Sequence, residues 1–128
     1  MALRLLAPTV AVVVAIAVSG CGGGEEEESS PPPGPASQTF QVSEKEYSLT
    51  PSTITIQSPG TYAFKATNDG TTDHGLEIEG NGVEEEIETL APGESGTLTV
   101  ALEAGTYEMY CPISNHRDLG MEGDVSVT

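Results

Sequence analysis

The 128-residue sequence contains 20 acidic residues and only 4 basic ones, which gives a formal net charge of −16. This imbalance argues against nucleic acid as a partner, because phosphate backbones attract lysine and arginine. It favours encounters with basic surfaces, although an acidic coat that keeps an exported protein soluble would have the same composition.

Residues 1–20 are predicted to be a secretory signal peptide. Arg4 precedes an apolar stretch, residues 5–18, which is too short for a confident transmembrane helix. The stretch leads into Val-Ser-Gly-Cys at residues 18–21, which resembles a bacterial lipobox. That resemblance implies that Cys21 is lipid-modified and tethers an extracytoplasmic protein to a membrane, at the bacterial cell surface or its periplasmic face. An ordinary cleavage site with an incidental cysteine is the alternative.

Residues 21–38 are predicted to be a linker. After Cys21 the sequence reads GGGEEEESSPPPGPASQ, which offers little apolar area to bury and carries like charge and proline. Such a segment is a solvated, extended tether. An exported chain with two cysteines would by default suggest a disulfide. Cys21 and Cys111 stand in such different contexts that we expect separate chemistry for each.

Residues 39–128 are predicted to form one all-β domain. Period-2 alternation between apolar and polar residues, with turn signals at short intervals, predicts an antiparallel β-sandwich of two sheets. Residues 84–90 fit a short helix or a strand equally well. The clearest alternating runs are residues 53–56, 62–66, 76–79 and 97–100, and the pattern continues in 106–110 and 123–127.

The alternation also predicts the core. Cys111 shares the parity of Tyr107 and Met109, so its sulfur should point inward at the end of the sandwich. A thiolate there is costly to bury unless a cation pairs with it. The predicted core side chains are Phe40, Val42, Tyr47, Leu49, Ile54, Ile56, Tyr62, Phe64, Ile78, Leu98, Val100, Tyr107 and Met109.

A candidate metal site lies near the C-terminus. Cys111, His116 and Met121 follow one another with four residues between each pair, and His74 is the only other histidine. Two imidazoles, one thiolate and a weak thioether are the ligand set of an electron-transfer copper site. Each residue alone has an ordinary explanation: a surface histidine, a core methionine or an inert buried thiol. Asn115, directly before His116, fits as a residue that tolerates a left-handed turn, which would tighten the loop.

These motifs resemble the cupredoxins, small blue copper proteins of the plastocyanin and azurin kind. Residues 68–74 (NDGTTDH) are similar to the turn before the first histidine ligand, and residues 105–111 (GTYEMYC) resemble the strand that delivers the cysteine. The resemblance implies a Greek-key β-sandwich with one type 1 copper held by His74, Cys111, His116 and Met121. A carbonyl from Asp73 would be a weak further ligand. Gly75 stands where relatives carry a polar residue that fastens the two ligand loops together.

The predicted function is that of a membrane-tethered electron carrier that cycles between Cu(II) and Cu(I). The resemblance implies that electrons pass through the edge of His116, surrounded by Pro112, Ile113 and Leu119. Tyr110 is a candidate second entry point, or else a plain cross-strand packing residue. Expected partners are redox proteins with basic docking surfaces, such as c-type cytochromes or a copper oxidase.

Two other classes of function fit the sequence less well. A copper-handling module that binds and passes copper without redox turnover would display exposed methionines and histidines, and the chain has three methionines including the initiator. A copper enzyme would need further histidines for a catalytic centre. A cysteine–histidine hydrolase built on Cys111 would leave Met121 without a role and lacks a nucleophile elbow. An enzyme is therefore not expected.

Overall fold

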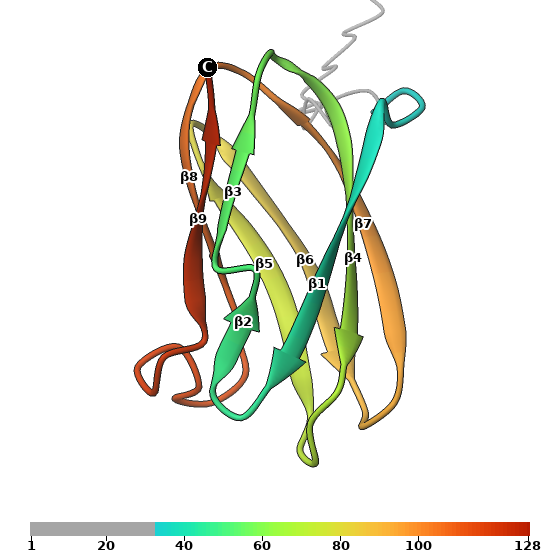
Figure 1. Ribbon diagram of the computed structural model, residues 1–128, viewed down its shortest axis with the longest axis vertical. Coiled ribbons are helices and arrows are strands. Elements are labelled where there is room, and N and C mark those ends of the chain that lie inside the picture. Colours follow the sequence, from blue (N-terminus) through green and yellow to red (C-terminus); the bar gives the residue numbers. More distant parts are fainter. Residues whose placement is uncertain (1–32) are drawn as a thin grey trace, which may run out of the picture. The chain divides into compact units, whose positions relative to one another are not determined.

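A computed structural model describes residues 33–128, and within them every regular element is a β-strand (Figure 1). Accordingly, no helix suited to crossing a membrane occurs among the residues described. The strands are β1 (Gln38–Lys45), β2 (Ser48–Thr50), β3 (Thr53–Ile56), β4 (Gly60–Asn68), β5 (His74–Gly80), β6 (Val83–Leu90), β7 (Ser95–Leu102), β8 (Gly105–Tyr110) and β9 (Glu122–Val127).

The strands form two sheets packed face to face, which confirms the predicted β-sandwich. One sheet has the order β2-β1-β4-β7 and the other β3-β9-β8-β5-β6. The expectation of purely antiparallel pairing was wrong for two pairs, because β1 runs parallel to β4 and β3 runs parallel to β9. The chain changes sheets between β2 and β3, and neither parallel pair is formed by strands that follow each other along the chain. Alternation reports which face a side chain takes, but it does not report strand direction.

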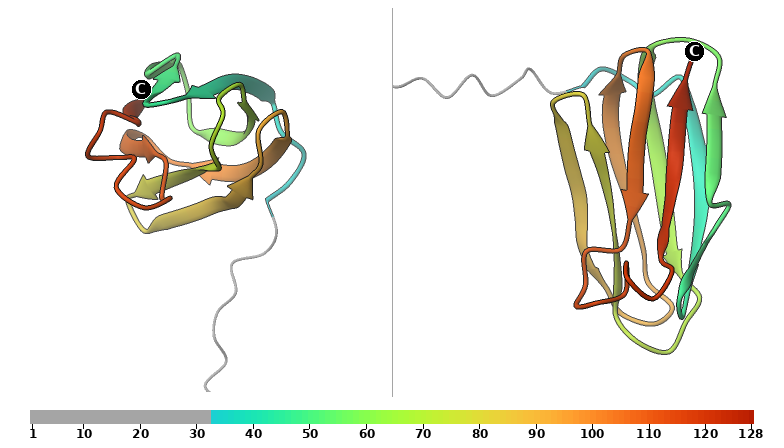
Figure 2. Two further views of the ribbon diagram at one scale, coloured as in Figure 1. Left: turned by 90° about the horizontal axis from the view of Figure 1, so that it is seen from below. Right: turned by 90° about the vertical axis from the view of Figure 1, so that its left-hand side faces the viewer.

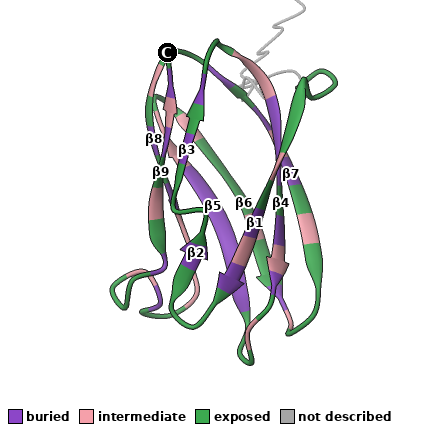
Figure 3. Cartoon of the chain, viewed as in Figure 1, coloured by how far each residue is buried: buried purple, intermediate pink, exposed green. Residues whose placement is uncertain are grey.

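The inward faces of both sheets form one apolar core (Figure 3). Most of the predicted core residues are buried, but Tyr47 is 40% exposed and Phe40 is only partly buried. Tyr47 lies in the turn between β1 and β2, where the alternation of a strand no longer applies. The prediction missed several fully enclosed side chains, including Leu76, Leu102 and Val125.

Residues 84–90 belong to strand β6, which settles the ambiguity between helix and strand. The strand lies at the edge of its sheet, paired with β5 alone. Its outward positions carry glutamates, while Leu90 is buried and Ile87 packs against the core. Charged side chains on an edge strand discourage pairing with other chains.

Four connections lie at the end of the sandwich opposite the C-terminus (Figures 1 and 2). One is the β6–β7 loop at residues 91–94, and the other three carry or contact the predicted copper ligands. They are the β1–β2 turn at residues 46–47, the β4–β5 loop at 69–73 and the long β8–β9 loop at 111–121. A backbone hydrogen bond ties the β4–β5 loop to β1, since Asp69 N–H donates to Glu44 O at 2.9 Å. All four predicted copper ligands lie in, or directly beside, these connections.

Candidate metal centre

Three of the predicted ligands converge at this end. His74 begins β5, Cys111 directly follows β8, and His116 lies within the β8–β9 loop. Their donor atoms all lie within 4.8 Å of one another. His74 Nδ1 is 3.3 Å from His116 Nδ1, and Cys111 Sγ is 3.6 Å from His116 Nδ1. The three residues are 0, 1 and 8% exposed.

This donor set fits a single soft metal ion. An ion bonded to nitrogen at about 2.0 Å and to sulfur at about 2.3 Å spans separations of this size. Two imidazole Nδ1 atoms and a thiolate are also the three strong ligands of a trigonal copper site. The cluster is therefore built as a metal centre rather than as a packed group of histidines.

The environment of Cys111 supports the same conclusion. Burial raises the pKa of the Cys111 thiol, and the negative charge of Glu44 raises it further, while the backbone amides of Ile113 and Gly75 act in the opposite direction. Without a cation the sulfur would stay protonated. A bound metal ion supplies the positive charge that stabilises a thiolate in such surroundings.

The β8–β9 loop is fixed by its own backbone. Cys111 N–H donates to Met121 O at 3.0 Å, and Met121 N–H donates to His116 O at 3.1 Å. The Met121 side chain is fully buried. The residue with a left-handed conformation is Ser114, with φ of 48°, so the expectation for Asn115 was wrong by one position.

The β4–β5 loop is fastened by Asn68. Its side-chain amide donates to Thr72 O at 2.7 Å and to Leu90 O at 2.8 Å, and its oxygen accepts from Gly70 N–H at 2.9 Å. Because Asn68 is fully buried, these bonds tie the loop to β6 away from water. This anchor keeps the His74 loop in place without a polar side chain at position 75.

Steric crowding explains why position 75 is a glycine. A Cβ at this position would lie 2.5 Å from Glu88 O and 2.6 Å from Ile87 O, so no side chain fits there. The register between β5 and β6 also shifts between His74 and Leu76. The glycine lets β6 approach the start of β5 closely, and its N–H remains available to the Cys111 sulfur.

The sequence reasoning missed Glu46, which lies in the β1–β2 turn. Its Oε1 accepts hydrogen bonds from Thr71 N–H at 2.6 Å and from Thr72 N–H at 2.8 Å. The same oxygen lies 3.1 Å from His74 Nε2. In a chain with twenty acids, nothing in the sequence distinguishes this glutamate from those that only face solvent.

Apolar side chains lie beside His116 and in its loop. The Tyr47 ring lies 5.1 Å from the His116 ring, measured between centroids, and Leu119 is 49% exposed. Pro112 and Ile113 are partly buried in the same loop. The residues predicted to surround the histidine thus occupy its loop, and Tyr47 joins them from the β1–β2 turn.

Tyr110 is held on the outer face of the second sheet. Its hydroxyl donates to Glu79 Oε2 at 2.7 Å, and the Arg117 guanidinium lies 4.0 Å from the centre of its ring. Burial, followed by the hydrogen bond to Glu79, raises the pKa of Tyr110 well above its ordinary value. The phenol therefore stays protonated, packed between a carboxylate and a cation.

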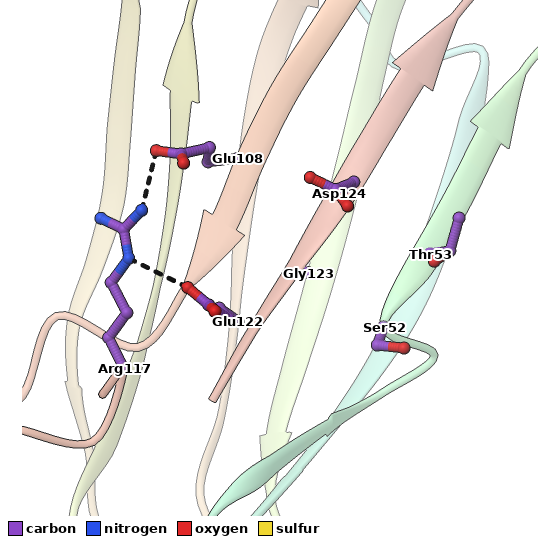
Figure 4. Close-up of a pocket in the computed structure, with 7 residues that line it drawn as sticks. All are labelled: Ser52, Thr53, Glu108, Arg117, Glu122, Gly123 and Asp124. Carbon is purple, nitrogen blue, oxygen red and sulfur yellow. Dashed lines mark hydrogen bonds and ion pairs between the residues drawn. The ribbon is translucent and has the colours of Figure 1, made fainter. Parts of the chain in front are cut away.

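Arg117 also fixes the ligand loop to the sheet. It forms ion pairs with Glu108 at 2.8 Å and Glu122 at 3.3 Å, beside a pocket that Asp124 also lines (Figure 4). Exposed pairs of this kind contribute only about 0–1 kcal/mol each. Their effect is to hold the residue next to His116 against β8 and β9.

Two predicted residues remain untested by this geometry. Cys21 lies outside the described residues. Asp73 is exposed and directly precedes His74, so its carbonyl stays a predicted weak ligand.

Comparison with known proteins supports the same architecture. A family model described as a cupredoxin-like domain matches residues 10–125. No curated protein sequence gives a significant match. Among solved structures, auracyanin B aligns with a TM-score of 0.65 at 18% identity, covering 74% of this chain and 91% of that one.

Two further auracyanins have the same fold. A dithionite-reduced auracyanin from Roseiflexus castenholzii aligns with a TM-score of 0.64 at 21% identity, covering 73% of this chain and 99% of that one. Auracyanin A, a "blue" copper protein from Chloroflexus aurantiacus, aligns with a TM-score of 0.61 at 16% identity, covering 70% and 98%. At these identities the likeness concerns the fold.

Proposed function

Because the chain belongs to the cupredoxin-like domain family, we propose that it is a blue copper protein that carries single electrons and is not an enzyme. The observation that carries the proposal is the buried cluster of His74, Cys111 and His116, with donor atoms within 4.8 Å. Copper bound there would supply the Cu(II)/Cu(I) couple. The similar structures named as auracyanins, one of them described as a "blue" copper protein, support this assignment.

The chain's own contribution is a rigid set of donors. His74 is held at the start of a strand, and Cys111 and Met121 are linked by a backbone hydrogen bond. Met121 is the proposed weak axial ligand, and the Asp73 carbonyl is a candidate second one. Ligands held this firmly change little between oxidation states, so each electron transfer needs little reorganisation.

Electrons would pass through His116, the most exposed of the three clustered residues, at 8%. The proposed docking surface around it consists of Tyr47, which contacts its ring, and of Pro112, Ile113 and Leu119 in the same loop. Tyr110 remains a candidate second route, because it adjoins Cys111 in sequence and is partly exposed. With a net charge of −16, the protein would dock on redox partners with basic surfaces, such as c-type cytochromes or a copper oxidase.

A lipid tether at Cys21 completes the proposal and places the domain outside the cytoplasm. It rests on the lipobox-like sequence at residues 18–21. A single acyl chain holds weakly, whereas two or more anchor firmly. The full-length protein should partition with detergent, and Cys21→Ser should release it or block its processing. Wild-type protein found only in the aqueous phase, with its N-terminus at another residue, would refute the tether.

The burial of the donors favours a carrier over a copper-handling module. A module that passes copper on must expose its ligands to an acceptor, whereas here His74 and Cys111 are 0 and 1% exposed. A carrier should keep Cu(I) when challenged with a chelator and still exchange electrons quickly. Rapid loss of Cu(I) together with slow electron exchange would transfer the assignment to copper handling.

Cu(II) titration of the reduced-thiol protein, followed by visible absorption, tests the proposal directly. We expect an intense blue band that arises from charge donation by the Cys111 thiolate. Cys111→Ser should abolish the band, and His116→Ala should open the site to solvent. A colourless wild-type protein in excess Cu(II) would exclude a blue copper site.

A further inference from the structure

The ring of His74 is contacted on both of its nitrogens. Nδ1 faces the cluster, 3.3 Å from His116 Nδ1, while Nε2 lies 3.1 Å from Glu46 Oε1. The His74 side chain is fully buried and that of Glu46 is 24% exposed. A metal-binding imidazole usually donates its second N–H to a neighbouring acceptor, which selects the tautomer and orients the ring. Here that acceptor is a carboxylate.

The carboxylate is held in place independently of His74. The amides of Thr71 and Thr72 and the Thr72 hydroxyl all donate to Glu46 Oε1, at 2.6, 2.8 and 3.1 Å. Gly70 leaves the space that the group needs, because a Cβ there would overlap the carboxylate. The loop that precedes His74 is thus wrapped around the Glu46 side chain.

These contacts also keep the group charged. A glutamate is ordinarily an anion at neutral pH, and the three hydrogen bonds that Glu46 Oε1 accepts favour the charged form. The Glu46 carboxylate lies on the opposite side of the His74 ring from the cluster of donor atoms.

We propose that Glu46 is a positioning residue of the metal centre, one that fixes the Nε2–H tautomer of His74 and places a negative charge directly behind this ligand. The inference rests on the proposed function for its redox part. A negative charge behind a ligand increases the donor strength of the imidazole and favours the more highly charged ion, so Glu46 should favour Cu(II) over Cu(I) and lower the reduction potential.

The tautomer is tested first, without copper. Long-range ¹H–¹⁵N NMR of the metal-free, thiol-reduced protein should show His74 in a single Nε2–H tautomer. Glu46→Ala should give a mixture of tautomers, while Thr72→Val, which removes one loop contact and leaves the carboxylate, should keep the single form. A His74 ring that is unchanged in Glu46→Ala would overturn the positioning role. This measurement holds even if the protein proves not to bind copper.

The potential is tested with charge-matched variants of the copper-loaded protein. Glu46→Gln keeps a similar shape and an acceptor oxygen but removes the charge. Asp69→Asn removes an equal charge from the same loop, from a residue that bonds to Ser43 instead of His74. We expect Glu46→Gln to weaken Cu(II) binding by about tenfold, the lower end of the usual effect of such partners on metal affinity, and to leave Cu(I) binding nearly unchanged.

A tenfold change corresponds to a rise of 59 mV for one electron, and Asp69→Asn should shift the potential far less. Equal shifts in the two variants would mean that only the general field of the acidic surface acts, and would overturn the redox part. Should Glu46→Ala fail to fold, because the β4–β5 loop has lost its anchor, the NMR signals of His74 in Glu46→Gln decide the positioning role. A weakened hydrogen bond there, seen as an upfield shift of the His74 Nε2–H proton or as a mixture of tautomers, supports the role of the carboxylate, and an unchanged His74 ring in a folded Glu46→Gln overturns it.

Discussion

Glu44 lies inside the sandwich next to the metal centre. It is 0% exposed, and neither carboxylate oxygen has a hydrogen-bond partner among the described residues. The residues paired with it on the two adjacent strands are buried as well, namely Leu49 on β2 and Asn68 on β4. Burial raises the pKa of Glu44 from 4.5 to about 8, so this acid should make the stability of the protein depend on pH.

The sign follows from proton binding. Because the pKa is higher in the folded state, the folded protein holds its proton more tightly, and its stability falls as the pH rises above 4.5. The loss continues until about pH 8, where the folded state also ionises. Each pKa unit corresponds to about 1.4 kcal/mol, so Glu44 should cost roughly 3 kcal/mol at pH 7 and at most about 5 kcal/mol above pH 8.

The assay is denaturant unfolding of the metal-free, thiol-reduced protein between pH 5 and pH 8. Glu44→Gln removes the ionisation and should flatten the decline in unfolding free energy over this range. Glu44→Met, which also removes the buried polar atoms, should stabilise the protein at pH 7 by a few kcal/mol. Parallel pH profiles for the wild type and Glu44→Gln would show that Glu44 titrates normally and would refute the argument from burial.

Three further predictions concern the site and its surface. Met121→Leu should raise the reduction potential and keep the blue colour, because leucine removes a weak donor, whereas Met121→Gln should lower the potential, because glutamine supplies a harder donor. Voltammetry measures both potentials, and an unchanged potential would make Met121 a packing residue. Asn68→Ala should lower the unfolding free energy by roughly 1–3 kcal/mol, because it strands the buried carbonyl of Leu90; chemical denaturation measures this, and no change would mean that the loop needs no such anchor. Electron transfer to a basic redox protein should slow as salt rises, because screening weakens the attraction to the acidic surface; stopped-flow rates that are flat with salt would contradict steering by charge.

The sequence predicted the architecture because alternation and turn signals report which face each side chain takes. The parity shared by Cys111 with Tyr107 and Met109 correctly placed its sulfur inward, and Cys111 is 1% exposed. The same logic failed for Tyr47, which sits in a turn where parity carries no information. It also could not show that β1 pairs in parallel with β4 and that β3 pairs in parallel with β9, because strand direction depends on where the chain changes sheets.

Proximity between distant segments was harder to predict. The meeting of His74 with Cys111 and His116 was predicted from the need for a second imidazole and from the resemblance of residues 68–74 to the turn before the first histidine ligand. Glu46 had no comparable requirement. Glu46 contacts His74 because the β1–β2 turn and the β4–β5 loop lie side by side at one end of the sandwich. Local sequence patterns do not predict which turns and loops become neighbours. The burial of Glu44 was equally hidden, since a charged residue in a strand is normally expected to face solvent.

The backbone hydrogen bond between Cys111 and Met121 joins the two ends of the eleven-residue segment 111–121. Three of the four proposed ligands lie within this closed segment, and β8 and β9 continue their pairing directly beyond it, with Tyr110 opposite Glu122. Changes of length between His116 and Met121 can therefore alter the ligand arrangement without disturbing the register of the sheets. During evolution, the ligand arrangement can therefore change through this short segment while the stability of the β-sandwich is preserved.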